Sequence, residues 1–194
     1  MPISLEIPLT PERIRELRAG DEVRVSGRLV TARDAAHRYL ASEDDPRVRE
    51  WLRGSLVYHC APVVARDPAT REWRFVAAGP TPSMREEPWE AEVIARYDVR
   101  GVIGKGGMGP RTLAALKEHG SVYLHAVAGL AVTLARHVTR VLDVHKLDEF
   151  GVSEAIWLVE VRDFPAVVTM DAHGESLHRV EPGPPPAPDD AAGR

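Results

Sequence analysis

The sequence predicts a single α/β domain, because stretches typical of strands and stretches typical of helices alternate through most of the chain. The chain has 194 residues, of which 44% are hydrophobic, and this is enough for one sizeable core. The segment from Glu181 onward is rich in proline and has too few apolar side chains to pack against that core. We therefore expect one domain over residues 1–180 and a disordered tail over residues 181–194.

Strands and helices are expected to alternate from the start of the chain. Apolar side chains at every second position around Val23 and Val25 predict a strand, and Thr31 and Asp34 have the spacing of a capping box, which predicts a helix start. Acidic residues and a proline predict the start of a later helix. The expected elements are extended residues 1–10, a helix over Pro11–Arg18, strands over Glu22–Val30, Ser55–Val64 (broken near Pro62) and Trp73–Ala78, and a helix over Pro88–Tyr97.

The second half continues the alternation. Pro110 suits the first position of a helix, where its missing N–H leaves no hydrogen bond unmade, so a helix is expected through His119. Short apolar runs bounded by turn residues predict strands, and a longer apolar run predicts another helix. The expected elements are strands over Val99–Ile103 and Ser121–Val127, a helix over Leu130–Val141, and strands over Ala155–Val161 and Ala166–Met170 separated by Asp163-Phe-Pro165.

Composition excludes several classes of function. The net charge of −4 lacks the basic excess of proteins that bind nucleic acid or membrane surfaces, so we expect neither partner. No apolar run approaches the ~20 residues of a membrane helix, and no secretory signal begins the chain, so a cytoplasmic location is expected. The single cysteine, Cys60, cannot hold an iron–sulfur cluster, and the eight histidines lack the pattern of a zinc hydrolase. We expect this chain alone to bind no metal or cofactor.

A glycine-rich segment, Gly101-Val-Ile-Gly-Lys-Gly-Gly-Met-Gly-Pro110, places Lys105 between an expected strand and an expected helix. Glycines allow the backbone to approach a ligand, and a helix N-terminus offers unpaired N–H groups, so the segment suits an anion. Its spacing matches neither the phosphate loop of nucleotide-hydrolysing enzymes nor the dinucleotide fingerprint. The alternative is an ordinary tight turn.

Three cations share one place in this order of elements. Arg33, Arg85 and Lys105 each follow an expected strand and lie at or just before a helix start. The helix dipole disfavours cations there, which suggests a compensating bound anion. Ligands of open α/β sheets bind at the carboxyl ends of the strands, where the three would meet if the strands are parallel. Two guanidinium groups and one ammonium fit a small dicarboxylate or hydroxy-diacid.

Local contacts are the alternative explanation for these residues. Thr81 could offer its hydroxyl to the same ligand or simply stabilise a turn, and His37 could face the same edge or lie in the core. Arg33 could instead pair with Asp34 or Glu22, Arg85 could pair with Glu86 or Glu87, and Lys105 could be solvated.

Taken together, these motifs resemble the C-terminal domain, or separate beta subunit, of class I fumarate hydratases and L(+)-tartrate dehydratases. The resemblance extends over about Ile7 to Val180. It is carried by Thr31-Ala-Arg-Asp-Ala-Ala-His37, Gly79-Pro-Thr-Pro-Ser-Met-Arg85, Ile103-Gly-Lys-Gly-Gly-Met-Gly109, Glu154-Ala-Ile-Trp157, and Asp163-Phe-Pro165 with Asp171-x-x-Gly174.

The resemblance implies a swivelling β/β/α domain that closes over a partner alpha subunit in an α2β2 assembly, with the substrate between them. The partner would hold a 4Fe-4S cluster whose open iron acts as a Lewis acid on the departing hydroxyl. Arg33, Arg85 and Lys105 would bind the substrate, while Thr81 and Lys105 would be the catalytic residues. The activity implied is a hydro-lyase reaction on fumarate and malate, tartrate or a close relative, which requires the alpha subunit.

The chain departs from the family pattern beside this site. Pro82 replaces a second threonine of the usual Gly-Pro-Thr-Thr-Ser-x-Arg-Met, Glu86 replaces its methionine, and Ala61 stands where glycine is usual. Pro82 removes a hydroxyl and an N–H, and Glu86 places a carboxyl next to Arg85. The substrate therefore stays open, and a non-catalytic dicarboxylate-binding or regulatory module is the competing hypothesis.

Overall fold

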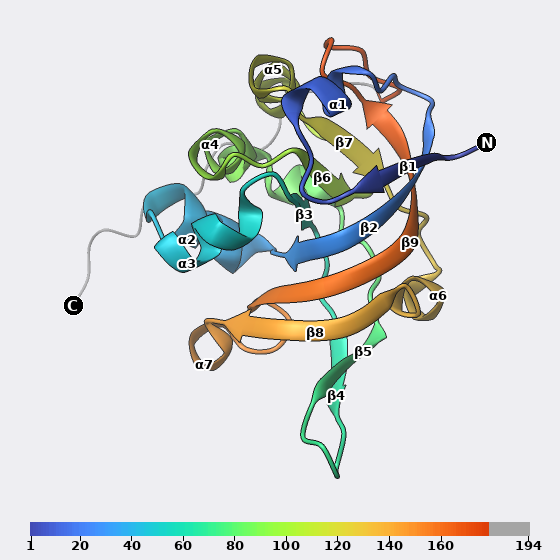
Figure 1. Ribbon diagram of the computed structural model, residues 1–194. Helices are drawn as coiled ribbons and strands as arrows, with labels where there is room; N and C mark the ends of the chain where they lie inside the picture. Colours follow the sequence, from blue (N-terminus) through green and yellow to red (C-terminus); the bar gives the residue numbers. More distant parts are fainter. Residues whose placement is uncertain (179–194) are drawn as a thin grey trace.

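A seven-stranded sheet organises the structure, a computed structural model in which residues 1–178 are described (Figure 1). The order of its strands is β1-β2-β3-β6-β7-β9-β8. A separate hairpin of β4 and β5 projects away from it, as Figure 1 shows. The strands are β1 (Ile3–Glu6), β2 (Glu22–Thr31), β3 (Leu56–Tyr58), β4 (Val63–Arg66), β5 (Trp73–Ala77), β6 (Gly101–Gly104), β7 (Val122–His125), β8 (Val138–His145) and β9 (Ile156–Met170).

The sheet closes on itself through its longest strand. Strands β1, β2, β3, β6 and β7 run parallel to their neighbours, whereas β9 is antiparallel to β2, β7 and β8. Because β2 also pairs with β3, and pairing continues through β6 and β7 back to β9, these strands form a ring. Apolar side chains fill its inside, among them Leu29, Tyr58, Ile103, Leu124 and Trp157.

Four helices contribute to a second core outside the ring. Their apolar faces pack with side chains of the parallel strands, including Val57 and Val102, and Figure 1 shows the helices together on one side. These helices are α2 (Asp34–Ser42), α3 (Pro46–Leu52), α4 (Glu87–Tyr97) and α5 (Pro110–His119); the remaining helical turns are α1 (Pro11–Arg15), η1 (Ser83–Arg85), α6 (Ala131–Ala135) and α7 (Leu147–Phe150). This mixed sheet, with helices packed on its outer side, confirms the expected α/β class.

Some expected elements are wrong in detail. The helix expected over Leu130–Val141 is only the short α6, and β8 begins at Val138, because β-branched side chains there pair with β9. The two late strands expected around Asp163-Phe-Pro165 are one continuous β9. Helices α3 and α7 were not expected. The predicted tail lies outside the described residues, so the boundary at residue 180 stays a prediction.

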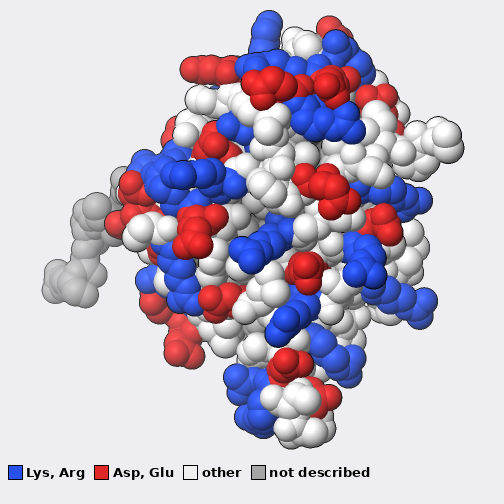
Figure 2. All heavy atoms as spheres, viewed as in Figure 1, with Lys and Arg blue, Asp and Glu red and all other residues white. Residues whose placement is uncertain are grey.

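The charged surface is mixed rather than of one sign. Figure 2 shows Lys and Arg side chains interspersed with Asp and Glu over the face that it draws. Within residues 1–178, every helix is too short or too polar to cross a bilayer.

Candidate functional site

Parallel strands bring the predicted cations to one edge of the sheet. The register pairs Thr31 with Tyr58 and Tyr58 with Ile103, so β2, β3 and β6 end side by side. Arg33 follows the end of β2 by two residues, and Lys105 comes directly after β6. The strands run in the same sense, which is the condition that the sequence-based hypothesis required.

Thr81 and Arg85 reach the same edge by a detour. The chain leaves β3, forms the β4–β5 hairpin and returns beside β3, where Cys60 and Pro80 form a backbone bridge. The Thr81 N–H and hydroxyl both donate to the His59 carbonyl, at 2.8 and 3.0 Å. Pro82 then forms a bridge with Lys105, whose carbonyl accepts from the Ser83 N–H at 3.0 Å. The segment therefore lies between the ends of β3 and β6.

A shared carboxylate connects the two arginines. Arg85 forms an ion pair with Asp34, whose other oxygen is 4.0 Å from Nη2 of Arg33. Nη1 of Arg33 lies 3.1 Å from Oε1 of Glu154. The Arg33 side chain is 15% exposed and that of Arg85 is 55% exposed, so Arg85 is the more accessible to a ligand. Within residues 1–178, Lys105 forms no ion pair.

The predicted capping box at the start of α2 is wrong. Arg33, not Thr31, is the N-cap residue, and the Thr31 hydroxyl has no hydrogen-bond partner among the described residues. Glu154 takes that place: its Oε2 accepts from the Ala35 N–H at 3.1 Å while its other oxygen contacts Arg33. The sequence analysis singled out the motif Glu154–Trp157, but it gave the role of acidic partner at this helix start to Asp34.

The glycine-rich loop holds an anion that belongs to the chain itself. Pro110 is the first residue of α5, as predicted, and the carboxylate of the buried Glu87 accepts four hydrogen bonds at this helix start. The donors are the N–H groups of Gly109, Arg111 and Thr112, at 2.7, 3.1 and 3.3 Å, and the Thr112 hydroxyl, at 2.6 Å. The expectation that a ligand occupies this helix N-terminus is therefore wrong. Within the loop, the charged side chain of Lys105 is the group that could still bind a ligand.

Two histidines and a glutamate are buried directly beneath these loops. Nε2 of His37 and Nε2 of His59 lie 2.9 and 2.8 Å from the same Glu90 oxygen, and all three residues are fully buried. Burial disfavours charge here, yet the two histidines lower the pKa of Glu90 to about 2, and Glu90 raises the pKa of His37 to about 9. Burial lowers the pKa of His59. His37 therefore belongs to the core and is not a ligand-facing residue.

Glu86 is buried beside this cluster, and it does not pair with Arg85 as one alternative proposed. Both of its carboxyl oxygens lack a hydrogen-bond partner among the described residues. Burial raises the pKa of Glu86 to about 8, although the charge of His37 opposes this. Glu86 is therefore a buried carboxyl group whose raised pKa favours its neutral form.

The chain's one cysteine does not fit an iron–sulfur cluster. Cys60 is 1% exposed, and burial raises the pKa of its thiol, so a thiolate able to bind iron is disfavoured. His37, His59 and Glu90 have ligand atoms within 4.8 Å of one another and could in principle hold a metal ion. His59 is, however, hydrogen-bonded to Glu90 at 2.8 Å, and His37 lies 2.9 Å from the same oxygen as its ion-pair partner, so protons already occupy this space.

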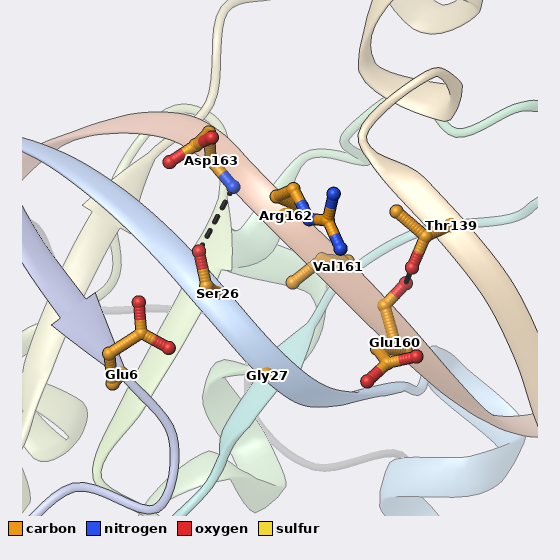
Figure 3. Close-up of a pocket in the computed structure, with 8 residues that line it drawn as sticks. All are labelled: Glu6, Ser26, Gly27, Thr139, Glu160, Val161, Arg162 and Asp163. Atoms are coloured by element: carbon orange, nitrogen blue, oxygen red, sulfur yellow. Dashed lines mark hydrogen bonds between the residues drawn. The ribbon is translucent and has the colours of Figure 1, made fainter.

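The hollow in Figure 3 lies elsewhere on the molecule. It has a volume of about 410 Å³, and its lining includes the carboxylates of Glu6, Glu160 and Asp163 but none of the three predicted cations. Asp163 donates its N–H to the Ser26 hydroxyl at 3.1 Å, the dashed line in Figure 3. Its three carboxylates outnumber its one cation, Arg162 (Figure 3), which disfavours a dicarboxylate, so this hollow is not the candidate site.

The fold and these contacts define an α/β domain with a cationic edge where the parallel strands end. A sequence profile of the family described as "Fumarase C-terminus" matches residues 1–181. The chain belongs to this fumarase C-terminus family.

Three relatives illustrate the family. A Geobacillus stearothermophilus protein named putative fumarate hydratase class I is 50% identical over 176 residues, which are 91% of this chain and 33% of that protein. The putative L(+)-tartrate dehydratase subunit beta of Methanocaldococcus jannaschii is 37% identical over 88% of each chain. The L(+)-tartrate dehydratase subunit beta of Escherichia coli K12 is 36% identical over 89% of this chain and 85% of its own length. The chain thus spans a third of the first relative and most of the other two.

Proposed function

We propose that this chain is the beta subunit of a hydro-lyase that reversibly hydrates or dehydrates a small dicarboxylate. The observation that carries the proposal is the arrangement of Arg33, Arg85 and Lys105 around the ends of three parallel strands. Relatives named fumarate hydratase and tartrate dehydratase subunit beta support the reaction class. The domain that performs this role is proposed to be residues 1–180.

The proposed roles follow from charge and exposure. Arg85 is exposed enough for a substrate carboxylate to replace Asp34 as the partner of its guanidinium group. Arg33 lies nearby, because it contacts the other oxygen of Asp34. Lys105 forms a backbone bridge with Pro82 and so brings a positive charge next to the segment of Thr81 and Arg85. This charge can stabilise negative charge that develops on the substrate during the reaction. The Thr81 hydroxyl donates its proton to the His59 carbonyl, so its oxygen lone pairs are free to accept a hydrogen bond from the substrate.

We propose that a partner completes the site, and the charge balance supports this. Two carboxylates, Asp34 and Glu154, already offset most of the charge of Arg33, Arg85 and Lys105. A bound dicarboxylate would leave an excess of negative charge, which calls for a further cation from outside this chain. We propose that an alpha subunit supplies it, holds the 4Fe-4S cluster that this chain cannot hold, and forms an α2β2 assembly.

Exposed apolar side chains offer that partner a docking surface beside the site. Ala131 at the start of α6 packs against Gly79, which begins the segment leading to Thr81. Around this contact, Val76 and Val132 are 38% and 58% exposed. Apolar surface next to polar loops is typical of protein–protein contacts. The longer Geobacillus relative, in which two thirds of the protein lie outside the matched region, is consistent with a partner domain.

Anaerobic co-expression with the cognate alpha subunit tests the proposal. Malate, fumarate, tartrate isomers and methylated relatives form the substrate panel. We expect turnover of one of them, and a decrease of at least about 10²-fold in Lys105→Ala, the scale for one lost charged contact in a transition state. The control is Lys117→Ala, in the last turn of α5. A non-catalytic dicarboxylate-binding module would bind the panel without turnover, and equal turnover in the two variants would contradict the role of Lys105.

A further inference from the structure

A chain of buried hydrogen bonds, completed by one buried ion pair, runs beneath the cationic edge and includes one atom from each cation-bearing segment. It starts at the Gly107 N–H, which donates to the Tyr123 hydroxyl at 3.3 Å. The Tyr123 hydroxyl donates to Oγ of Ser83 at 2.9 Å, and Oγ of Ser83 is 2.8 Å from Nδ1 of His59. Nε2 of His59 is 2.8 Å from Oε2 of Glu90. From Glu90 the chain continues through His37.

The end of the chain is the backbone of Arg33 itself. Nε2 of His37 lies 2.9 Å from the same Glu90 oxygen, an ion-pair contact that lacks hydrogen-bond geometry, and Nδ1 of His37 lies 3.0 Å from the Arg33 carbonyl. The three segments are therefore linked: Gly107 is in the loop of Lys105, Ser83 is in the segment of Arg85, and Arg33 takes part directly. Ser83, His59, Glu90 and His37 are all fully buried.

Each proton in this chain has one consistent place. Since Ser83 accepts from Tyr123, its own proton is directed to Nδ1 of His59, which makes His59 a neutral ring protonated on Nε2. That Nε2–H donates to Glu90. The carbonyl of Arg33 requires a proton on Nδ1 of His37. The Glu90 carboxylate, 2.9 Å from Nε2, favours a second proton there, which makes His37 and Glu90 an ion pair.

The backbone around these hydrogen bonds leaves little room for larger residues. A Cβ atom on Gly104 would lie 1.8 Å from Oγ of Ser83 and 3.0 Å from the Tyr123 hydroxyl. Only glycine at the end of β6 therefore leaves room for the Ser83–Tyr123 contact. This gives Gly104 of the glycine-rich loop a role in packing against the buried chain, in addition to turn formation.

We propose that the buried chain from Gly107 to His37 positions Arg33, Arg85 and Lys105 so that they contact one dicarboxylate together. The proposal rests on the proposed function for its ligand. Ser83, His59, Glu90, His37 and Tyr123 are positioning residues, because they touch the cation-bearing segments and not the substrate. Loss of a central link lets two of the segments move independently.

A pair of matched tyrosine variants in the assembled protein tests this role. Tyr123→Phe removes one donated and one accepted hydrogen bond within the chain. Tyr97→Phe is the control, because the Tyr97 hydroxyl also donates one bond, to the Glu43 carbonyl, and accepts one, from the Asp45 N–H. Both tyrosines are 0% exposed, so both variants lose similar stability.

We expect Tyr123→Phe to lower kcat/KM about 10- to 100-fold, the scale of a small misplacement of binding groups, with Tyr97→Phe within about twofold of the wild type. Hydrogen exchange at the amides of Gly106–Gly107 and Ser83–Arg85 should be faster only in Tyr123→Phe. Equal kcat/KM in the two variants would overturn the proposal while leaving the proposed function intact. If the wild type turns over no substrate on the panel, the proposed function fails, and the exchange rates alone decide the positioning role.

Histidine ¹⁵N spectra provide a second readout that needs no activity. At pH 7 we expect His59 to be neutral with its proton on Nε2 and His37 to carry two protons, and Ser83→Ala should shift the His59 signals. A His59 proton on Nδ1, or one metal ion per chain bound to His37, His59 and Glu90, would overturn the assignment.

Discussion

Replacing Glu87 with glutamine should unfold the start of α5 and with it the glycine-rich loop. The Glu87 carboxylate accepts from two N–H groups through Oε1 and from the Gly109 N–H and the Thr112 hydroxyl through Oε2. In Glu87→Gln, an amide NH₂ must face at least one of these N–H donors, whichever way the amide is turned. A buried backbone donor is then left without an acceptor, and the helix start loses its negative charge.

The expected magnitude follows from these two losses. A buried unsatisfied donor costs about 1–3 kcal/mol, and a lost charge at a helix N-terminus costs about 0.3–1 kcal/mol, or about 2 when partly buried. The sum is about 1–5 kcal/mol, with a central value of about 3 kcal/mol. Because each kcal/mol lowers the Tm of a domain of this size by about 2–4 °C, we expect a decrease of about 5–15 °C.

The matched control is Glu92→Gln, which makes the same chemical change in the same helix. Glu92 is 44% exposed and, among residues 1–178, pairs only with the exposed Arg111, so its loss should cost less than about 1 kcal/mol. Urea denaturation and differential scanning calorimetry of both variants measure the difference. Equal midpoints for Glu87→Gln and Glu92→Gln would refute the assignment of Glu87 as the anion at this helix start.

Two further predictions concern charge in the buried layer. Folding raises the pKa of His37 from 6.5 to about 9 and the pKa of Glu86 from 4.5 to about 8. The folded chain therefore binds these protons more tightly than the unfolded chain, and stability should fall as pH rises through these two ranges. Glu86→Gln should reduce the loss of stability between pH 5 and pH 8, and an unchanged loss in urea denaturation would contradict the buried neutral carboxyl. Glu154→Gln should lower the free energy of unfolding by about 1–2 kcal/mol, because Arg33 loses a largely buried partner. Glu149→Gln, which breaks an exposed pair with Lys146, should cost less than about 1 kcal/mol, and similar values for the two variants would count against Glu154 as the partner of Arg33.

The strand-to-helix junctions could be predicted from sequence because their signals are local. Alternating valines, Pro110 and the glycine cluster each indicate structure within a few residues, and they placed Arg33 and Lys105 just beyond strand ends. That the ends lie side by side depended on parallel pairing, which local signals do not contain. The structure supplies it through the register of β2, β3 and β6.

The groups that complete the helix starts could not be predicted, because they come from distant parts of the sequence. Glu154 accepts a hydrogen bond from the N–H of Ala35, 119 residues away in the sequence, and Glu87 accepts one from Gly109, 22 residues away. The nearby Thr31 and Asp34 satisfied the local capping pattern equally well. In both cases a carboxylate distant in sequence takes the place of a local capping residue.

The failed helix over Leu130–Val141 has a similar cause. Its apolar composition suits a buried helix or a buried strand, and periodicity does not separate the two over so short a run. Pairing of Val138 and Val141 with β9 decides in favour of a strand. The buried hydrogen bonds under the site could not be predicted either, because the histidines, serine and tyrosine that form them are adjacent only in the folded structure.

A crystal structure of the assembled protein with a bound, unreactive dicarboxylate tests the central claim most directly. The account predicts one carboxylate of the ligand on the guanidinium groups of Arg33 and Arg85, with the ammonium of Lys105 within about 3 Å of a ligand oxygen. A dicarboxylate bound away from the ends of β2, β3 and β6, with Arg33, Arg85 and Lys105 all contacting only protein or water, would contradict it.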